Sequence, residues 1–94
     1  MTSYNMLNGV YAAAHSGLID GICRTEWKYD GWIMTDWGVH SPTTDCIKGG
    51  SDTVMPGDYV TAAQFAEQGV DRATAQYRVT NLIKHLAKTE NHMP

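Results

Sequence analysis

A short run of bulky apolar residues that ends in a carboxylate constrains this chain most. Trp32–Met34 is apolar on successive positions and follows the turn signal Asp30-Gly31. A run that is apolar on both faces predicts a strand buried on both sides, as in a parallel sheet covered by helices. Asp36 then stands where this strand meets a loop, which is where barrel enzymes carry their chemical groups.

The neighbours of Asp36 leave two roles open for it. Trp37 follows directly, and a Trp beside a carboxylate suits an apolar ring face such as that of a sugar. Carboxylates in loops after strands also commonly cap the next helix. Position alone therefore predicts either a catalytic or a capping Asp36.

Short apolar runs alternate with helix-forming segments along the rest of the chain. Met1–Tyr4 has the character of a strand end, Asn8-Gly9 is a turn signal, and a further strand is predicted near Thr53–Met55. Helices are expected over residues 16–27 with Ser16 as cap, over 42–48 begun by Ser41-Pro42, over about 62–68, and over about 71–88. The predicted buried stripe of the last helix is Ala75, Val79, Leu82, Ile83 and Leu86. Residues 89–94 are expected to fray.

This alternation predicts the fold class. Strands separated by helices form βαβ units and a parallel sheet. A chain of 94 residues is far shorter than the about 250 residues of a complete (β/α)8 barrel. We therefore predict an α/β fold in which residues 1–94 are a single partial domain, a slice of a TIM barrel with parallel strands and crossover helices. Its open edges and poorly covered sheet face favour self-association.

Composition and spacing argue against several classes of partner. The formal net charge is −3 with no basic cluster, so no nucleic acid is expected. The apolar runs are too short to span a membrane, and no signal-peptide pattern is visible. The four His residues, Cys23 and Cys46 lack metal-ligand spacing, so no metal or cofactor is expected. We expect both cysteines to be free core residues, which favours a reducing compartment. The absence of a signal-peptide or transmembrane pattern favours the cytoplasm.

Other polar and aromatic residues are assigned structural roles. Asp52 is expected to accept hydrogen bonds from backbone amides near the start of a strand. Arg24 and Glu26 should face water or form ion pairs, and Trp27 and Trp32 should be core residues of the complete barrel. His40 is expected to be a solvated loop residue.

Five ordered blocks of the chain resemble glycoside hydrolase family 3, the β-glucosidase type. The resemblance covers nearly the whole chain, with matching gaps between the blocks. The third block, Met34–Gly38, is similar to the nucleophile motif of that family. The other blocks are Met1–Asn5 with Asn8–Val10, Arg24–Trp27 with Asp30-Gly31, Cys46–Gly57, and Gly69–Asn81.

The resemblance implies the roles of individual residues. It makes Asp36 the catalytic nucleophile, with Tyr4 beside it, Trp37 as a wall of the sugar pocket, and Met1 lining the same pocket. It also implies that the chain is the C-terminal part of the catalytic barrel, containing its last strands and helices.

The implied chemistry is that of a retaining glycosidase. Such an enzyme needs a second carboxyl about 5–5.5 Å from the nucleophile, and no block here matches the acid/base of the family. The expectation is a fragment of a hydrolase that releases terminal β-D-glucosyl residues from β-glucosides or oligosaccharides, inactive on its own. The alternative is a catalytically inactive remnant that acts as a carbohydrate-binding or self-associating module.

Overall fold

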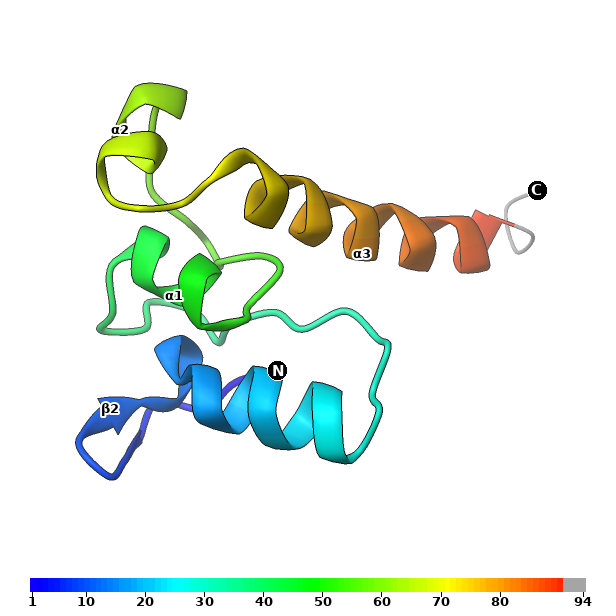
Figure 1. The fold of residues 1–94 in the computed structure, drawn as a ribbon, viewed down its shortest axis with the longest axis horizontal. Coiled ribbons are helices and arrows are strands. Elements are labelled where there is room, and N and C mark those ends of the chain that lie inside the picture. Colours follow the sequence, from blue (N-terminus) through cyan, green and yellow to red (C-terminus); the bar gives the residue numbers. More distant parts are fainter. Residues whose placement is uncertain (91–94) are drawn as a thin grey trace.

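The structure, a computed structural model, describes residues 1–90 and is rich in helix (Figure 1). Helix α1 lies between η2 and α3 and contacts both. In chain order the elements are β1 (Met6–Leu7), β2 (Val10–Tyr11), η1 (Ala12–Ala14), η2 (Gly17–Glu26), α1 (Thr43–Gly49), α2 (Ala62–Glu67) and α3 (Arg72–Glu90).

Parallel pairing joins three segments that are far apart in sequence. Thr2 pairs with Thr35 and Met34 pairs with Thr53, both in parallel. Residues 32–36, the central segment, therefore lie between the other two. The parallel direction predicted for the strands near residues 32–35 and 53–55 is confirmed, although each pairing is an isolated bridge rather than a continued ladder.

Within residues 1–90, the continuous β-sheet is a two-stranded hairpin, which sequence patterning did not predict. Strands β1 and β2 pair antiparallel around Asn8-Gly9. Asn8 and Gly9 have φ values of 51° and 82°, and both residue types tolerate this left-handed region in two-residue hairpin turns. The turn signal at Asn8-Gly9 thus closes a hairpin that the strand analysis omitted.

The helices follow their predicted ranges closely, while two of their caps differ. Thr61 and Gln64 cap α2 reciprocally, and the Asp71 carboxylate accepts the Thr74 N–H at the start of α3. Ser16 makes no side-chain capping bond. The ring nitrogen Nδ1 of His15 accepts the Leu18 N–H instead, at 3.1 Å.

Helices η2 and α1 also differ from expectation in detail. η2 is wound as a π-helix, with the Trp27 N–H donating to Ile22 at 2.9 Å. Helix α1 begins one residue later than predicted, so Pro42 occupies its N-cap rather than its first helical position. Gly50 ends α1 with a φ of 124°, a conformation that favours glycine.

The core is small and as polar as it is apolar. Its buried apolar residues are Ala12, Ala13, Ile19, Ile33, Cys46 and Val70. Its buried polar residues are Thr35, Thr44, Ser51, Asp52, Arg78 and Asn81. Cys23 and Cys46 are both free, as expected. Trp27, predicted to be a core residue of the complete barrel, is 71% exposed at the end of η2 in this chain.

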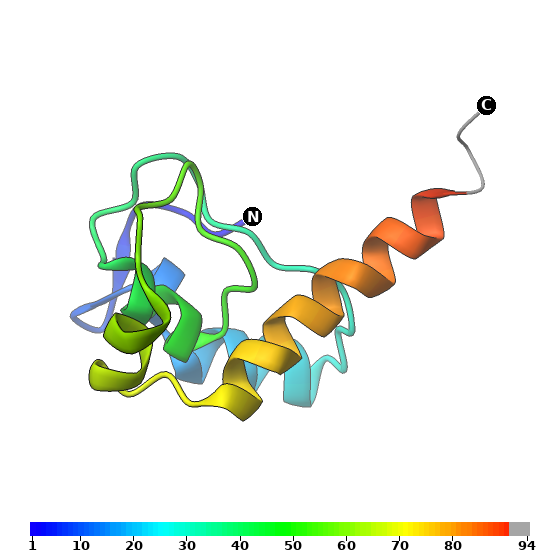
Figure 2. The same cartoon turned by 90° about the horizontal axis from the view of Figure 1, so that it is seen from above.

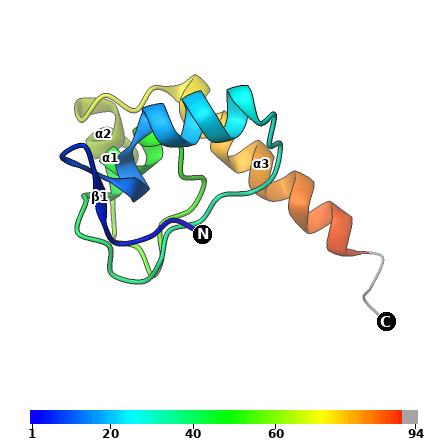
Figure 3. The same ribbon diagram turned by 90° about the horizontal axis from the view of Figure 1, so that it is seen from below.

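The face of α3 that packs on the body is not the predicted one. Arg78 and Asn81 are buried, whereas Val79, Ile83 and Leu86 are each more than half exposed. The prediction of a buried stripe is therefore wrong for most of its residues, because the polar network formed by Arg78 and Asn81 decides which face turns inward. Figures 2 and 3 show the C-terminal half of α3 extending beyond the rest of the molecule.

The two ends of α3 complete the comparison with the expected elements. Thr89 and Glu90 continue α3, so the predicted fraying does not apply to them, and residues 91–94 lie outside the described part. Within residues 1–90, no helix combines the length and the apolar character needed to cross a membrane.

A close backbone contact between α1 and η1 leads to a stability prediction. A Cβ added at Gly49 would collide with the main chain of Ala14, which cannot move away as a flexible side chain would. We expect Gly49→Ala to destabilise the fold by about 1–3 kcal/mol. Urea unfolding followed by circular dichroism measures this change.

The matched control is Gly21→Ala on the exposed face of η2. Its added Cβ would lie 3.9 Å from the nearest atom, the carbonyl oxygen of Ser16. This variant should be neutral or more stable by about 0.5–1 kcal/mol, because alanine loses less conformational entropy in a helix. Equal unfolding midpoints for the two variants would contradict the proposed α1–η1 contact.

Candidate functional site

Asp36 lies at the carboxyl end of the central parallel segment. Thr35 before it is fully buried, Asp36 is half-buried, and Trp37 after it is 50% exposed. The Trp37 N–H donates to Asp36 Oδ1 at 2.8 Å. This contact orients the carboxylate at the point where the chain emerges to the surface.

Two neighbouring segments hold the main chain around Asp36. On one side, the Thr2 N–H donates to the Met34 carbonyl at 2.8 Å. On the other side, the Thr35 N–H donates to Thr53 and the Gly38 N–H donates to Met55, both at 3.1 Å. The carboxylate is therefore flanked by hydrogen bonds on both sides of its own residue.

Thr35 contributes its side chain as well as its main chain. Its Oγ1 accepts the Met55 N–H at 2.9 Å, in place of a carbonyl acceptor. Sequence reasoning did not single out Thr35, since a Thr at the end of an apolar run carries no distinctive signal. Its complete burial and its hydrogen bond make it part of the frame that supports Asp36.

Tyr4 joins this site from the N-terminal segment. Its hydroxyl donates to the Trp37 carbonyl and lies beside the Asp36 carboxylate. Partial desolvation, a hydrogen bond with Asp36 and the negative charge of Asp36 together raise the pKa of Tyr4 above its ordinary value. The phenol and the carboxylate are thus electrostatically coupled, although 46% of the Tyr4 residue is exposed.

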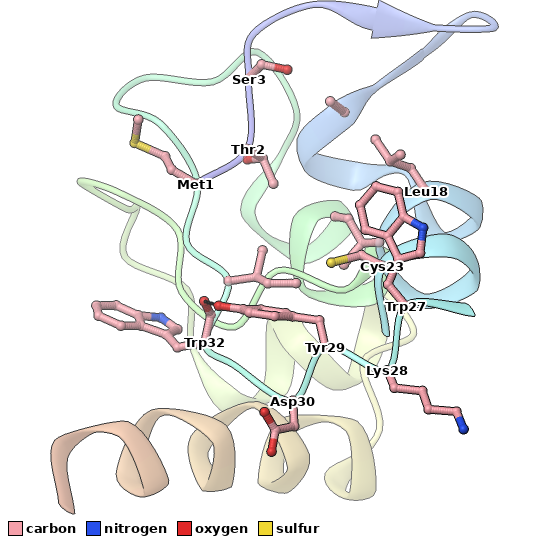
Figure 4. A pocket seen from close by; sticks show the side chains of 13 residues that line it. Met1, Thr2, Ser3, Leu18, Cys23, Trp27, Lys28, Tyr29, Asp30 and Trp32 are labelled. Carbon is pink, nitrogen blue, oxygen red and sulfur yellow. Dashed lines mark hydrogen bonds between the residues drawn. The ribbon is translucent and has the colours of Figure 1, made fainter. Parts of the chain in front are cut away.

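Met1 is found elsewhere, in a large cavity that does not include Asp36. This cavity has a volume of about 720 Å³ and lies between the N-terminal segment, η2 and residues 28–33. Figure 4 shows Met1 at its edge, with Trp27, Tyr29 and Trp32 among the surrounding side chains. The structure therefore brings Tyr4, Asp36 and Trp37 together. Met1, which is 75% exposed, lines the separate cavity instead.

Other acidic groups occupy different places. Asp52 is buried and accepts a hydrogen bond from the Ile33 main-chain N–H at 2.9 Å, as predicted. Glu26 and Asp30 are exposed on or after the end of η2, and Asp30 lines the large cavity. Asp36 is thus the carboxylate that stands with Tyr4 and Trp37 in the described part of the chain.

Sequence reasoning missed a buried cluster of charges behind this site. Arg24, expected to face water or pair, has only 7% of its side chain exposed and donates to Asp52 at 2.8 Å. Asn81 donates to the same carboxylate at 3.0 Å. The recurrence of Thr74, Arg78, Asn81 and His85 at helical spacing on α3 was the available signal, but an apolar stripe on the same helix outweighed it.

His40 and metal binding complete the survey of candidate groups. His40 is exposed, as expected for a solvated loop residue, and its ring lies 5.6 Å from that of Tyr11 between centroids. Over residues 1–90, no three His, Cys, Asp or Glu side chains gather into a group that could hold a metal ion.

The contact between Tyr4 and Asp36 makes a direct prediction. Asp36→Asn should lower the pKa of Tyr4 toward its ordinary value, because the phenolate would no longer form beside a negative charge. Because the pKa of Tyr4 is higher in the folded state than in the unfolded state, Tyr4 contributes to the free energy of unfolding below its unfolded pKa. This contribution is lost as pH rises through the folded pKa.

The measurement is a pH titration of the Tyr4 ring carbon resonance, which is assigned from its disappearance in Tyr4→Phe. Asp58→Asn is the matched control, since Asp58 accepts from Thr43 in another loop. A pKa of Tyr4 that stays the same in Asp36→Asn would show that the two side chains are not coupled in solution.

Comparison with known proteins places this geometry in context. No protein-family profile matches the chain. β-Glucosidase B of Emericella nidulans is 35% identical over 94% of this chain and 11% of its own length. A β-glucosidase of Rhizobium radiobacter is 45% identical over 63% of this chain and 7% of its own length. The chain thus spans about a tenth of the length of the curated relatives it matches.

Solved structures give the same result. β-Glucosidase D2-BGL from Chaetomella raphigera superposes with a TM-score of 0.71 and 27% identity, over 84% of this chain and 12% of that one. A β-glucosidase from Kluyveromyces marxianus gives a TM-score of 0.65 and 31% identity, over 95% of this chain and 12% of that one. Sequence and fold together show that the chain is related to the β-glucosidases of glycoside hydrolase family 3, of whose length it matches one segment.

Proposed function

We propose that this chain is the nucleophile-bearing segment of a retaining glycoside hydrolase that releases terminal β-glucosyl residues from β-glucosides or oligosaccharides. The observation that carries this proposal is the position of Asp36, half-buried at the exit of a parallel segment, with Tyr4 and Trp37 around it. The names and the lengths of the related β-glucosidases support both the activity and the status as a segment.

The proposed architecture is the C-terminal part of a (β/α)8 barrel, formed by residues 1–94 as one partial domain. Three parallel segments in the spatial order Thr2, Thr35, Thr53 support it, because consecutive barrel strands are parallel neighbours. The carboxyl ends of those strands are where barrel enzymes carry their active sites. Asp36 and Gly38 follow such an end directly.

Each residue has a role in the proposed reaction. The Asp36 carboxylate attacks the anomeric carbon and displaces the leaving oxygen, which forms a covalent glycosyl-enzyme. The Trp37 N–H orients the attacking carboxylate, and the half-exposed Trp37 ring offers an apolar surface to the sugar. Tyr4 donates one hydrogen bond, to the Trp37 carbonyl, and holds its hydroxyl beside the nucleophile. A carboxyl from another part of a longer protein protonates the leaving oxygen and then activates water.

The nucleophile is tested in a longer protein that carries this segment. Asp36→Asn should abolish turnover of an aryl β-glucoside and leave sugar binding largely intact, because the amide is nearly isosteric but does not attack. Asp36→Ala with added azide should release a glycosyl azide of inverted configuration, because azide replaces the carboxylate in a single displacement. Activity of Asp36→Asn within about 2 kcal/mol of wild type would show that another group is the nucleophile.

The isolated chain should show no significant glycosidase activity. Retaining hydrolysis needs two carboxyls at a short separation. The Asp52 carboxylate does not serve as the second, because it is buried and accepts hydrogen bonds from Arg24 and from the Ile33 N–H. Purified chain is assayed on an aryl β-glucoside, with Asp36→Asn as the control for contaminating enzyme. Turnover that survives purification and disappears in the variant would overturn this expectation.

Native mass measured on the same sample decides how such an activity would arise. A monomer would place the second carboxyl within the chain, and an oligomer would place it in another copy. Self-association is part of this proposal, supported by the half-exposed stripe of Val79, Ile83 and Leu86 on α3.

A further inference from the structure

The buried carboxylate of Asp52 is surrounded by donors from three other parts of the fold. Its Oδ2 accepts from Arg24 Nη2 at 2.8 Å and from the Ile33 N–H at 2.9 Å. Its Oδ1 accepts from Asn81 Nδ2 at 3.0 Å and lies 3.9 Å from Arg78 Nη1. The side chain of Asp52 is fully buried, so these contacts replace the water that an ionised carboxylate otherwise needs.

Arg24 connects this cluster to two main-chain carbonyl groups in different segments. Its guanidinium also donates to the carbonyl of Gly31 and to that of Gly50, each at 3.1 Å. Gly31 immediately precedes the central segment and Gly50 immediately follows α1. The ion pair therefore ties η2 to the beginning of the segment that ends at Asp36.

Asp52 and Ile33 are joined by a reciprocal pair of hydrogen bonds. The Asp52 N–H donates to the Ile33 carbonyl at 2.7 Å, while the Asp52 side chain accepts the Ile33 N–H. A slip of one residue between neighbouring strands would break both bonds and would turn every following side chain to the opposite face. This pair sets the register at the start of the central segment.

The register set there continues to the candidate nucleophile. Thr35 donates to Thr53 and accepts from Met55 through its side chain, and Gly38 donates to Met55. Asp36 lies between these contacts, three residues after Ile33. Its position along the segment and the face to which it points are consequences of the same register.

We infer that Asp52 is a positioning residue for Asp36, acting through the Ile33 main chain to hold the nucleophile beside Tyr4. This inference rests on the proposed role of Asp36. Asp52 itself touches no substrate, since its side chain is buried at the opposite end of the segment and both its oxygens are occupied.

The choice of variant follows from the donors around Asp52. In Asp52→Asn the side chain offers one acceptor and one donor, so its NH2 group must face either Ile33 and Arg24 or Asn81, all of which donate. The segment should shift to relieve this conflict. In Asp52→Asn/Asn81→Asp the carboxylate moves to position 81 and accepts from Asn at 52, which frees the amide oxygen for Ile33 and Arg24.

The matched control is Asp20→Asn. Asp20 lies 3.6 Å from Arg24 Nε and 3.8 Å from Arg78 Nη2, but it is 43% exposed and bonds no part of the central segment. It tests the loss of a charge next to the same two arginines without a change in the register contacts.

The readout is the pKa of Tyr4 in the full 94-residue chain, obtained by NMR titration. In Asp52→Asn the pKa of Tyr4 should fall by at least half of the amount by which it falls in Asp36→Asn. The exchanged double variant should recover most of that loss, and Asp20→Asn should match wild type. In an Asp36→Asn background, Asp52→Asn should have no further effect, because the coupled charge is already absent.

An unchanged pKa of Tyr4 in folded Asp52→Asn would overturn the inference, as would an equal loss in Asp20→Asn. Dispersed amide resonances establish that a variant is folded. If Asp52→Asn is unfolded, Asp52→Glu takes its place with the same two outcomes, since it keeps the charge but displaces the carboxylate by one methylene. None of these readouts requires turnover, so a failure here is distinct from a failure of Asp36 as nucleophile.

Discussion

The parallel contact between the segment of Asp36 and the segment of residues 52–55 is the interaction on which the candidate site depends. It combines main-chain hydrogen bonds with two side-chain acceptors, Asp52 at one end and Thr35 at the other. Each such bond contributes only about 1 kcal/mol, but together they leave one register. That register determines which side chains of the segment are buried and which reach the surface beside Tyr4.

Polar interactions carry an unusual share of this small fold. The buried apolar residues are few, and three of the six are alanine or cysteine. The cluster of Arg24, Asp52, Arg78 and Asn81 joins η2, the central segment and α3. A buried ion pair is costly to form and more costly to break from one side. The cluster therefore contributes more to the specificity of the arrangement than to net stability.

The exposed apolar groups are consistent with the partial barrel proposed for this chain. The chain matches about a tenth of the length of the related β-glucosidases, and the partial barrel proposed for it would have two open sheet edges. Val79, Ile83 and Leu86 on α3 and Trp27 at the end of η2 would each gain about 1.5–3 kcal/mol on burial. Their exposure supports the proposal that this chain packs against further strands and helices of a longer protein.

Local signals in the sequence were sufficient for the helices, for the turn at Asn8-Gly9 and for the parallel direction of the central segment. They were sufficient because capping residues, glycines and apolar period act over a few residues. The five ordered sequence blocks likewise predicted the resemblance to β-glucosidases. The hairpin of β1 and β2 and the π winding of η2 were not predicted, since neither has a distinctive pattern over such short lengths.

Tertiary structure alone decided which partners meet. The sequence determined that Asp36 ends a buried apolar run and that Asp52 would bond a backbone amide. The family resemblance had implied that Tyr4 lies beside Asp36. Only the fold placed Met1 in a separate cavity and buried Arg24 against Asp52. For the same reason, α3 buries its polar face with Arg78 and Asn81 instead of the predicted apolar stripe. A buried carboxylate must collect its donors from wherever the chain offers them, and on α3 that requirement outweighed the apolar stripe.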